Sequence, residues 1–302
     1  MSDPSDLRAC PKFEWPTWAL LVLTYATWGI ATAGNLPLWL AIPLVTLSAT
    51  LHSSLCHEAL HGHPTRWARL NEILVSPALT ICVPYGRFRD THLQHHHDER
   101  LTDPYDDPEA NFMDPAVWEQ LSPGWQRVLR FNNSLFGRML VGPAIGLWAF
   151  ILGDMRAIAK GDHAIRREWL LHIPALAVVI WWLAAFGTMP IWAFVLATYA
   201  GWSILKIRTF LEHRAKERAC ERTVIVEDRG LLALLFLNNN FHAVHHTHPG
   251  VPWYRLPALY AARQGEYLRK NGAYRYSSYA EVFRRYFFVA KDPVPHPLWR
   301  KR

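Results

Sequence analysis

The chain has 302 residues, a formal net charge of +7 and 51% hydrophobic residues, with 15 Trp and 16 His, and this length is sufficient for a large core. Its excess of Lys and Arg lacks the interleaved aromatic–basic pattern of RNA-binding proteins, so it indicates a surface facing anionic lipid and no nucleic-acid partner. The cysteines, Cys10, Cys56, Cys82 and Cys220, have no paired spacing, which excludes a zinc ribbon, an iron–sulfur motif and a disulfide framework.

Two long segments contain no charged residue, from Trp15 to His57 and from Trp169 to Leu205. Each is about twice the ~20 residues that one membrane helix needs, and each has a turn signal near its middle, at 34–37 and 187–190. We therefore predict an all-α integral membrane protein with two transmembrane hairpins. The predicted spanning helices are 17–34, 37–56, 169–187 and 190–208. The alternative is a water-soluble protein with two unusually hydrophobic buried hairpins.

The distribution of charge predicts the orientation. Both hairpin tips lack Lys and Arg, so the positive-inside rule places both termini and the middle of the chain on the cytoplasmic side. The polar arm 1–14 lacks a cleavable signal pattern, so the first spanning helix is expected to target the protein. We predict one domain over 1–302, with a cytoplasmic helical cap formed by 57–168 and 209–302.

Three short histidine clusters lie far apart in the sequence, outside the predicted spanning helices. Residues three or four apart share one face of a helix, so each cluster directs its imidazoles one way. The segment 206–217 is predicted to continue the fourth helix and to add one more imidazole. The predicted metal ligands are His57, His61, His92, His95, His96, His213, His242, His245 and His246. No catalytic side chain is predicted beyond these ligands.

The number of imidazoles indicates two metal ions. A zinc site uses three or four ligands, whereas neutral imidazole also suits redox metals with open positions for O2. The apolar segments 70–85 and 139–153 are predicted not to cross the membrane, because one extra crossing would separate the clusters. Candidate partners that orient the imidazoles are Glu58, Asp98, Glu212, Asn239 and Asn240. The acidic loop 98–107 is either a solvated turn or a further source of such partners.

Two other classes of protein remain open at this point. The segment His57-Glu58-Ala59-Leu60-His61 matches the H-E-x-x-H helix of zinc proteases, but a membrane metalloprotease would leave the other two clusters unused. A histidine-rich metal transporter is the non-enzymatic alternative. It would need polar ligands within the spanning segments, and these segments are nearly bare of them.

The clusters resemble the three histidine boxes of the membrane-bound fatty acid desaturase superfamily. The resemblance rests on His57-x3-His61, His92-x2-His95-His96 and His242-x2-His245-His246, and on the Glu212-His213 pair. It implies a non-haem di-iron centre with two Fe ions, O2 as co-substrate, and an external electron donor such as ferredoxin with its reductase. It also implies a multi-pass location, here expected in the bacterial inner membrane.

The reaction implied by this resemblance is introduction of a carbon–carbon double bond into a fatty acyl chain. The alternative on the same scaffold is a hydroxylase or decarboxylase of a fatty acyl, hydrocarbon or carotenoid substrate. The geometry of the substrate at the iron would decide between these outcomes.

Overall fold

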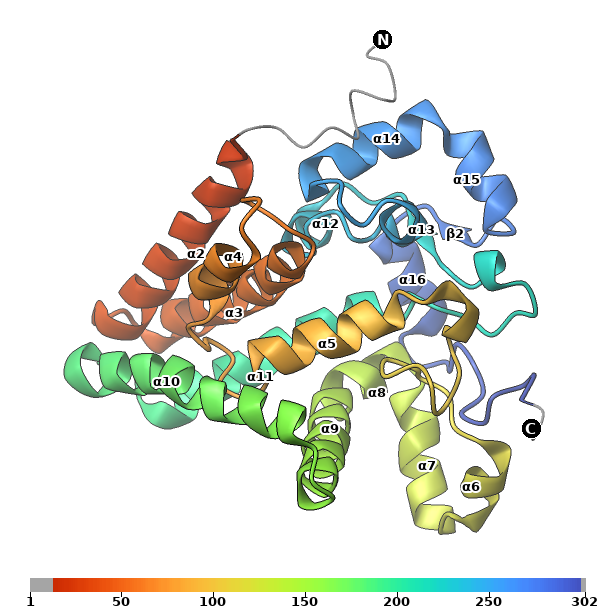
Figure 1. The fold of residues 1–302 in the computed structure, drawn as a ribbon, viewed down its shortest axis with the longest axis horizontal. Coiled ribbons are helices and arrows are strands. Elements are labelled where there is room, and N and C mark those ends of the chain that lie inside the picture. Colours follow the sequence, from red (N-terminus) through yellow and green to blue (C-terminus); the bar gives the residue numbers. More distant parts are fainter. Residues whose placement is uncertain (1–12, 300–302) are drawn as a thin grey trace. The chain divides into compact units, whose positions relative to one another are not determined.

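The computed structural model describes residues 13–299 (Figure 1). The predicted polar arm at 1–14 thus falls almost wholly outside the described residues, as do both chain ends and the side chain of Asp98. The described chain is mainly helical and divides into two compact units. Unit 1 contains 90–142 and 206–299, and unit 2 contains 13–89 and 143–205. The boundaries fall within three helices, α5 (Tyr85–His95), α9 (Gly142–Ala159) and α11 (Ile191–Thr209).

Helices occupy all four ranges that were predicted to span. In unit 2 these are α2 (Trp15–Ala33), α3 (Leu38–Leu60) and α10 (His163–Phe186), and α11 covers the fourth range. The helix α10 begins earlier than predicted because the Asp162 carboxylate accepts a hydrogen bond from the backbone N–H of Ile165 and caps the first turn. Unit 2 also contains most of α9, which has 18 residues, and α4 (Ala68–Val75), which has only eight. That length is far short of the ~20 needed to span.

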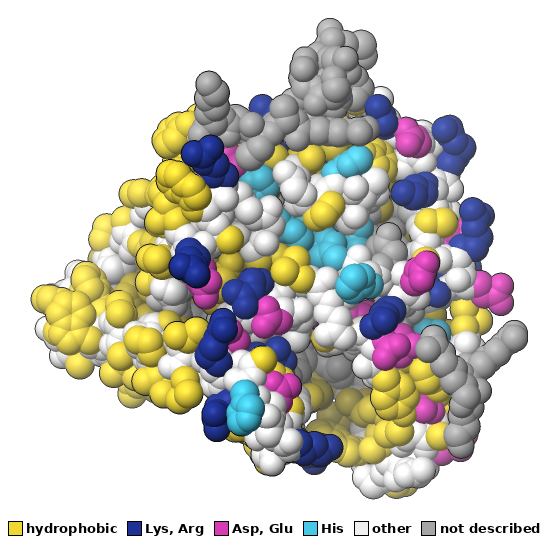
Figure 2. All heavy atoms as spheres, viewed as in Figure 1, with side chains coloured by type: hydrophobic (Ala, Val, Ile, Leu, Met, Phe, Trp, Pro, Cys, Tyr) yellow, Lys and Arg dark blue, Asp and Glu magenta, His cyan; other side chains and the backbone are white. Residues whose placement is uncertain are grey.

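Two helices are long and apolar enough to cross a membrane, namely α3 and α10. Half of the most apolar 18-residue stretch of α3 is buried, whereas only 11% of the corresponding stretch of α10 is buried. Exposed apolar side chains gather over the part of unit 2 that contains α2 and α10 (Figure 2). Monomeric soluble proteins rarely expose apolar patches beyond a few hundred Å², so this surface favours a lipid environment.

Small side chains allow α3 and α11 to pack closely within unit 2. The hydroxyl of Thr46 donates to the carbonyl of Ala197 at 3.1 Å, and that of Thr50 donates to the carbonyl of Gly201 at 3.3 Å. A Cβ on Gly201 would lie only 3.0 Å from the Cβ of Ala49. Such small interfacial residues and interhelical hydrogen bonds are typical of helix packing in membranes.

The two predicted hairpin turns contact each other. The backbone N–H of Thr188 donates to the carbonyl of Thr32 at 2.9 Å, and the indole N–H of Trp182 donates to the Thr32 hydroxyl at 3.0 Å. The backbone N–H of Asn35 in turn donates to the Thr188 hydroxyl at 3.1 Å. The loops at 34–37 and 187–190 therefore lie at the same end of unit 2.

Unit 1 is built from short helices and one pair of strands. Its helices are α6 (Pro115–Gln120), α7 (Pro123–Asn132), α8 (Leu135–Leu140), α12 (Leu231–Leu235), α13 (His242–Thr247), α14 (Leu256–Ala262), α15 (Gln264–Lys270) and α16 (Tyr279–Tyr286). The strands β1 (Ile225–Val226) and β2 (Arg275–Tyr276) pair in parallel, Ile225 opposite Arg275 and Val226 opposite Tyr276.

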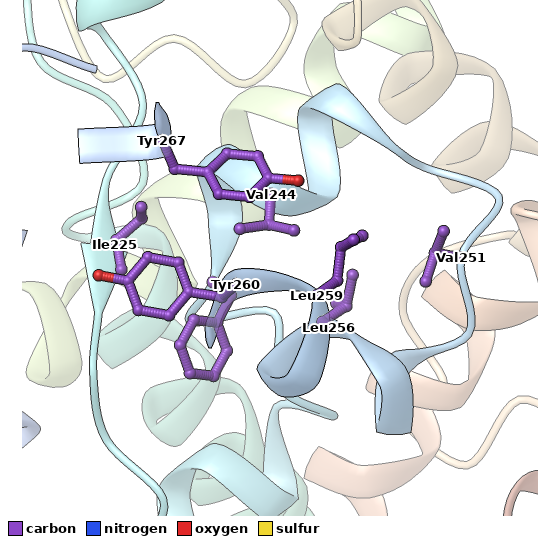
Figure 3. Packing of buried hydrophobic residues seen from close by; sticks show 8 residues of the cluster. Ile225, Val244, Val251, Leu256, Leu259, Tyr260 and Tyr267 are labelled. Atoms are coloured by element: carbon purple, nitrogen blue, oxygen red, sulfur yellow. The ribbon is translucent and has the colours of Figure 1, made fainter. Parts of the chain in front are cut away.

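An apolar cluster fixes the position of α13 in unit 1. Val244 is fully buried and packs with Ile225, Leu259, Tyr260 and Tyr267 (Figure 3). Because α13 turns Val244 into this core, the helical spacing directs its three histidines to another face. The core of unit 1 thereby positions one of the three histidine clusters.

The continuation of the fourth helix over 206–217 was a wrong prediction. The helix α11 ends at Thr209. Beyond it, His213 forms an isolated antiparallel bridge with Thr223, and the backbone N–H of Arg214 donates to the carbonyl of Arg222 at 2.9 Å. Pairing with this distant segment satisfies the backbone groups that a helix would have used. His213 is therefore presented by an extended segment.

Candidate metal centre

Seven of the nine predicted ligands lie in unit 1. His92 and His95 occupy the last turn of α5 and His96 follows it, while His242, His245 and His246 share α13. The seventh is His213. These imidazoles form two adjacent sets, and the rings of His96 and His246 stack across them with centroids 4.4 Å apart.

The first set consists of His95, His213, His242 and His246. One ring nitrogen from each of these residues lies within 4.8 Å of the corresponding atoms of the others. The Nε2 atom of His213 is 2.9 Å from Nε2 of His95 and 3.2 Å from Nε2 of His242. Three of the four residues are buried, and His246 is partly buried. Four imidazoles in such a group could hold one metal ion.

A second set in unit 1 consists of His92, His96 and His245. The Nε2 atom of His96 is 3.0 Å from Nε2 of His92 and 3.2 Å from Nε2 of His245. Their candidate ligand atoms also lie within 4.8 Å of one another. This set offers three nitrogens to a second ion.

Acceptors outside the two sets assign the ring protons. The Nδ1–H of His95 donates to Asp107 Oδ1 at 2.7 Å, and that of His92 donates to Glu109 Oε1 at 2.9 Å. The Nδ1–H of His242 donates to Asn239 Oδ1 at 3.0 Å. A neutral imidazole with its proton on Nδ1 presents a lone pair at Nε2. These outer contacts therefore direct Nε2 lone pairs into the cluster, as they do in metal-bound histidines.

This arrangement fits a bound cation. Lone pairs that converge at about 3 Å repel one another unless a proton or a metal ion lies between them. The donor set is all imidazole, which suits iron, zinc, copper and nickel. The nitrogens of the two sets could therefore hold two metal ions, which is the number that the sequence indicated.

The carboxylates around the first set favour positive charge inside it. Burial lowers the pKa of His95, but Glu109 and Asp107 outweigh this effect and raise it to about 9. Burial and the neighbouring cationic imidazoles hold the pKa values of His213 and His242 well below the usual value of histidine. Near neutral pH, a metal ion entering this set would therefore displace a proton from His95.

The other two predicted ligands, His57 and His61, lie in unit 2 at the end of α3. Their ring centroids are 4.9 Å apart, and His57 is 2% exposed. The Glu58 carboxylate lies 3.8 Å from Nδ1 of His57. The pair has the one-turn spacing that the sequence predicted.

Three histidines outside the predicted ligand set have other partners. Nδ1 of His63 lies 2.7 Å from the Glu14 carboxylate, a ring nitrogen of His172 lies 3.1 Å from the carbonyl oxygen of Ile81, and His296 lies 3.2 Å from the Thr102 hydroxyl. None of these three belongs to the two sets above.

The sequence of this chain is similar to those of known proteins over most of its length. The family model described as fatty acid desaturase matches residues 33–278. The chain belongs to the fatty acid desaturase family. This family comprises membrane-bound, non-haem di-iron enzymes, and the matched range contains all nine predicted ligands. A β-carotene ketolase from Paracoccus sp. (strain N81106 / MBIC 01143) is 27% identical over 232 residues, covering 73% of this chain and 74% of the ketolase.

Of the orienting partners predicted for this desaturase-family chain, Asn239 contacts an imidazole directly. Glu212 pairs mainly with Arg208 at 2.8 Å and lies 3.8 Å from Nδ1 of His242. Asn240 instead donates to the carbonyls of Val226 and Asp228, so it holds the loop before α13.

The sequence reasoning missed Glu109. This residue lies just beyond the acidic loop 98–107, and its carboxylate accepts from His92. Within the loop, Asp107 acts as an imidazole acceptor, which was one of the two predicted interpretations of that segment. The sequence offered one indication that Glu109 belongs to the site, because Glu109 is an acidic residue only 17 positions after His92.

Proposed function

We propose that this chain is an O2-dependent, iron-containing membrane oxidoreductase that oxidises unactivated C–H bonds of a lipid chain, introducing a carbon–carbon double bond into a fatty acyl group. The observation that carries the proposal is the convergence of imidazole nitrogens in unit 1. The outer contacts to Asp107, Glu109 and Asn239 give those nitrogens the tautomer that a metal ion requires. The family match supports the same chemistry.

The proposed ligand set contains all nine predicted histidines. Support for His57 and His61 comes from their one-turn spacing, the burial of His57 and their inclusion in the family match. When bound, a pair of iron ions would supply the O2 reduction and C–H oxidation that amino-acid side chains cannot. The chain itself supplies neutral imidazoles, holds their outer protons and surrounds them with carboxylates. An external donor such as ferredoxin with its reductase would supply the electrons.

We further propose four membrane spans formed by α2, α3, α10 and α11, with unit 1 in the cytoplasmic cap. The contact between the two hairpin turns supports this topology, because both turns must then lie on the same side of the bilayer. The apolar exposure of α10 supports it as well. The absence of Lys and Arg from both turns favours the non-cytoplasmic side for them, and the bacterial inner membrane is the proposed location.

A second candidate reaction is conversion of a carotenoid to a ketone. It is favoured by the similarity to the Paracoccus β-carotene ketolase. Both reactions begin at a C–H bond of a long apolar molecule, so the same imidazole cluster serves either one. Hydroxylation and decarboxylation of a fatty acyl chain or a hydrocarbon remain further outcomes on this scaffold.

The test is expression of the full chain with a matched reductase in two bacterial hosts, one of which also makes β-carotene. Mass spectrometry of the total lipids then reports the reaction. Fatty acyl chains that lose two hydrogens support desaturation, and a gain of one oxygen indicates hydroxylation. A carotenoid that gains an oxygen and loses two hydrogens supports the second candidate. If neither host gives a product that disappears in a His95→Ala variant, the proposal is wrong.

A further inference from the structure

A polar cavity of about 330 Å³ opens in unit 1 at the surface formed by β2, α16 and the loop that carries Arg214. Its wall includes Arg214, Tyr274, Arg275, Tyr276, Arg285 and Lys291. Among its lining residues, Ala273 alone lacks a polar side-chain group. The volume is at the lower end of the ~300–1,000 Å³ range of small-molecule sites. The polar wall excludes an apolar ligand.

The wall carries more positive than negative charge. Arg275 pairs with Glu227 at 2.7 Å and Arg285 pairs with Glu281 at 2.6 Å, while Lys291 pairs with Asp292. The fourth cation, Arg214, forms no ion pair with a carboxylate in the described part of the chain. One positive charge is therefore left over, and an anion could compensate it.

Arg214 is held rigidly at the cavity wall. Its Nε donates to the carbonyl of Glu221 at 3.0 Å, and its NH2 group donates to the carbonyls of Asn271 and Gly272 at 3.3 and 3.2 Å. The left-handed backbone at Gly272 (φ 62°) turns these two carbonyls toward the guanidinium. The guanidinium also lies 4.3 Å from the ring centroid of Tyr274. A group fixed in this way loses little entropy when it binds a ligand.

The chemistry of the wall matches a phosphate group. Guanidinium groups offer paired N–H donors that fit the oxygens of phosphate, and several of them around one cavity suit an anion with more than two oxygens. Lys291 adds an ammonium group that already donates to the backbone carbonyl of His213 at 3.1 Å. The hydroxyls of Tyr276 and Tyr286, 3.0 Å apart, lie at the same wall.

We propose that this cavity binds a phosphate group, supplied either by a small soluble phosphate ester or by the headgroup of an anionic phospholipid. The site is separate from the histidine cluster, and its occupancy does not require iron. Lys291 lines the cavity and also donates to the backbone carbonyl of His213, so this one side chain would separate the bound phosphate from the backbone of His213.

The test uses the full chain purified in detergent and compares it with two variants at constant ionic strength. Inorganic phosphate and glycerol phosphate are titrated by calorimetry. Thermal stability is then measured in nanodiscs with and without phosphatidylglycerol. Arg285→Gln removes one wall cation whose side chain is more than half exposed, so the fold should tolerate it. Arg263→Gln is the matched control, because Arg263 pairs with Glu266 and does not line the cavity.

The expected result is saturable binding that weakens about tenfold or more in Arg285→Gln, because a charge-assisted hydrogen bond to the phosphate is lost, and that is unchanged in Arg263→Gln. Binding of the soluble phosphates assigns a small ester, whereas stabilisation by phosphatidylglycerol alone assigns a lipid headgroup. The inference is overturned if neither ligand binds saturably or if both variants lose binding equally. Iron content is measured on the same samples, so a protein that binds no iron is distinguished from one that binds no phosphate.

Discussion

The Nδ1 atom of His95 lies 2.7 Å from Oδ1 of Asp107, and both side chains are almost fully buried. The other oxygen of the same carboxylate accepts a hydrogen bond from the backbone N–H of Thr102 at 2.9 Å. Asp107 therefore fixes the tautomer of an imidazole and is itself fixed by the backbone. This contact makes the acidic loop part of the proposed metal centre.

Replacing Asp107 by Asn should weaken iron binding. The amide keeps the size of the side chain, but it removes the negative charge that stabilises a cation through His95. Loss of such an outer partner typically costs about 10–100-fold in metal affinity. The measurement is a titration of the metal-free protein with iron(II). Asp106→Asn is the control, because it makes the same change of charge in the same loop. Equal affinities for the two variants would show that Asp107 does not support the centre.

Removing His213 should abolish both iron binding and oxidation. This residue approaches His95 and His242 at 2.9 and 3.2 Å between Nε2 atoms, so His213→Ala leaves the first set without its central nitrogen. The iron content of purified protein and the lipid products in the expression host are the two measurements. His163→Ala, at the exposed start of α10, should leave both unchanged. A His213→Ala protein that keeps its full iron content would remove His213 from the ligand set.

The sequence predicted correctly which imidazoles lie together where local spacing determines direction. The clusters at His92 and His242 lie on or beside helices, so the three- and four-residue spacing alone places their imidazoles on one face. Helices likewise cover the four long apolar ranges. In these cases the periodicity of the chain and the geometry of the helix agree.

The sequence failed where contacts between distant segments decide. His213 leaves α11 because its backbone pairs with Thr223, and no local pattern encodes this pairing. The two asparagines before α13 are equivalent in sequence, yet only Asn239 turns toward an imidazole. Within the acidic loop, Asp103 accepts hydrogen bonds from its own turn while Asp107 turns inward. Only the folded loop distinguishes such carboxylates.

Glu58→Gln separates the proposed function from the metalloprotease alternative. In an H-E-x-x-H protease the glutamate is the general base, so its loss would abolish activity, whereas loss of His95 would have a small effect. The proposed oxidoreductase predicts the opposite ranking, because His95 belongs to the first set of imidazoles, whereas Glu58 lies outside both sets and 3.8 Å from Nδ1 of His57. Iron content and lipid oxidation of Glu58→Gln and His95→Ala are compared in one host. Peptide cleavage that depends on Glu58 would contradict the proposal.

Gly201→Ala should destabilise the helices of unit 2. The new methyl group would lie 3.0 Å from the Cβ of Ala49 and 3.2 Å from the carbonyl oxygen of Thr46, so α3 and α11 would have to move apart. Overpacking of this kind typically costs ~1–3 kcal/mol. The shift would also strain the interhelical bond from the Thr46 hydroxyl to Ala197. Thermal unfolding in detergent and in nanodiscs measures the effect.

Gly153→Ala is the matched control for this change. Gly153 lies within α9, and a Cβ added there meets no atom within 4 Å. An alanine in the interior of a helix is favoured over glycine by ~0.5–1 kcal/mol, so this variant should be as stable as the original protein or more so. The ordering of the two variants depends on close contact between α3 and α11. If Gly201→Ala proves as stable as Gly153→Ala, the two helices do not pack through these small residues.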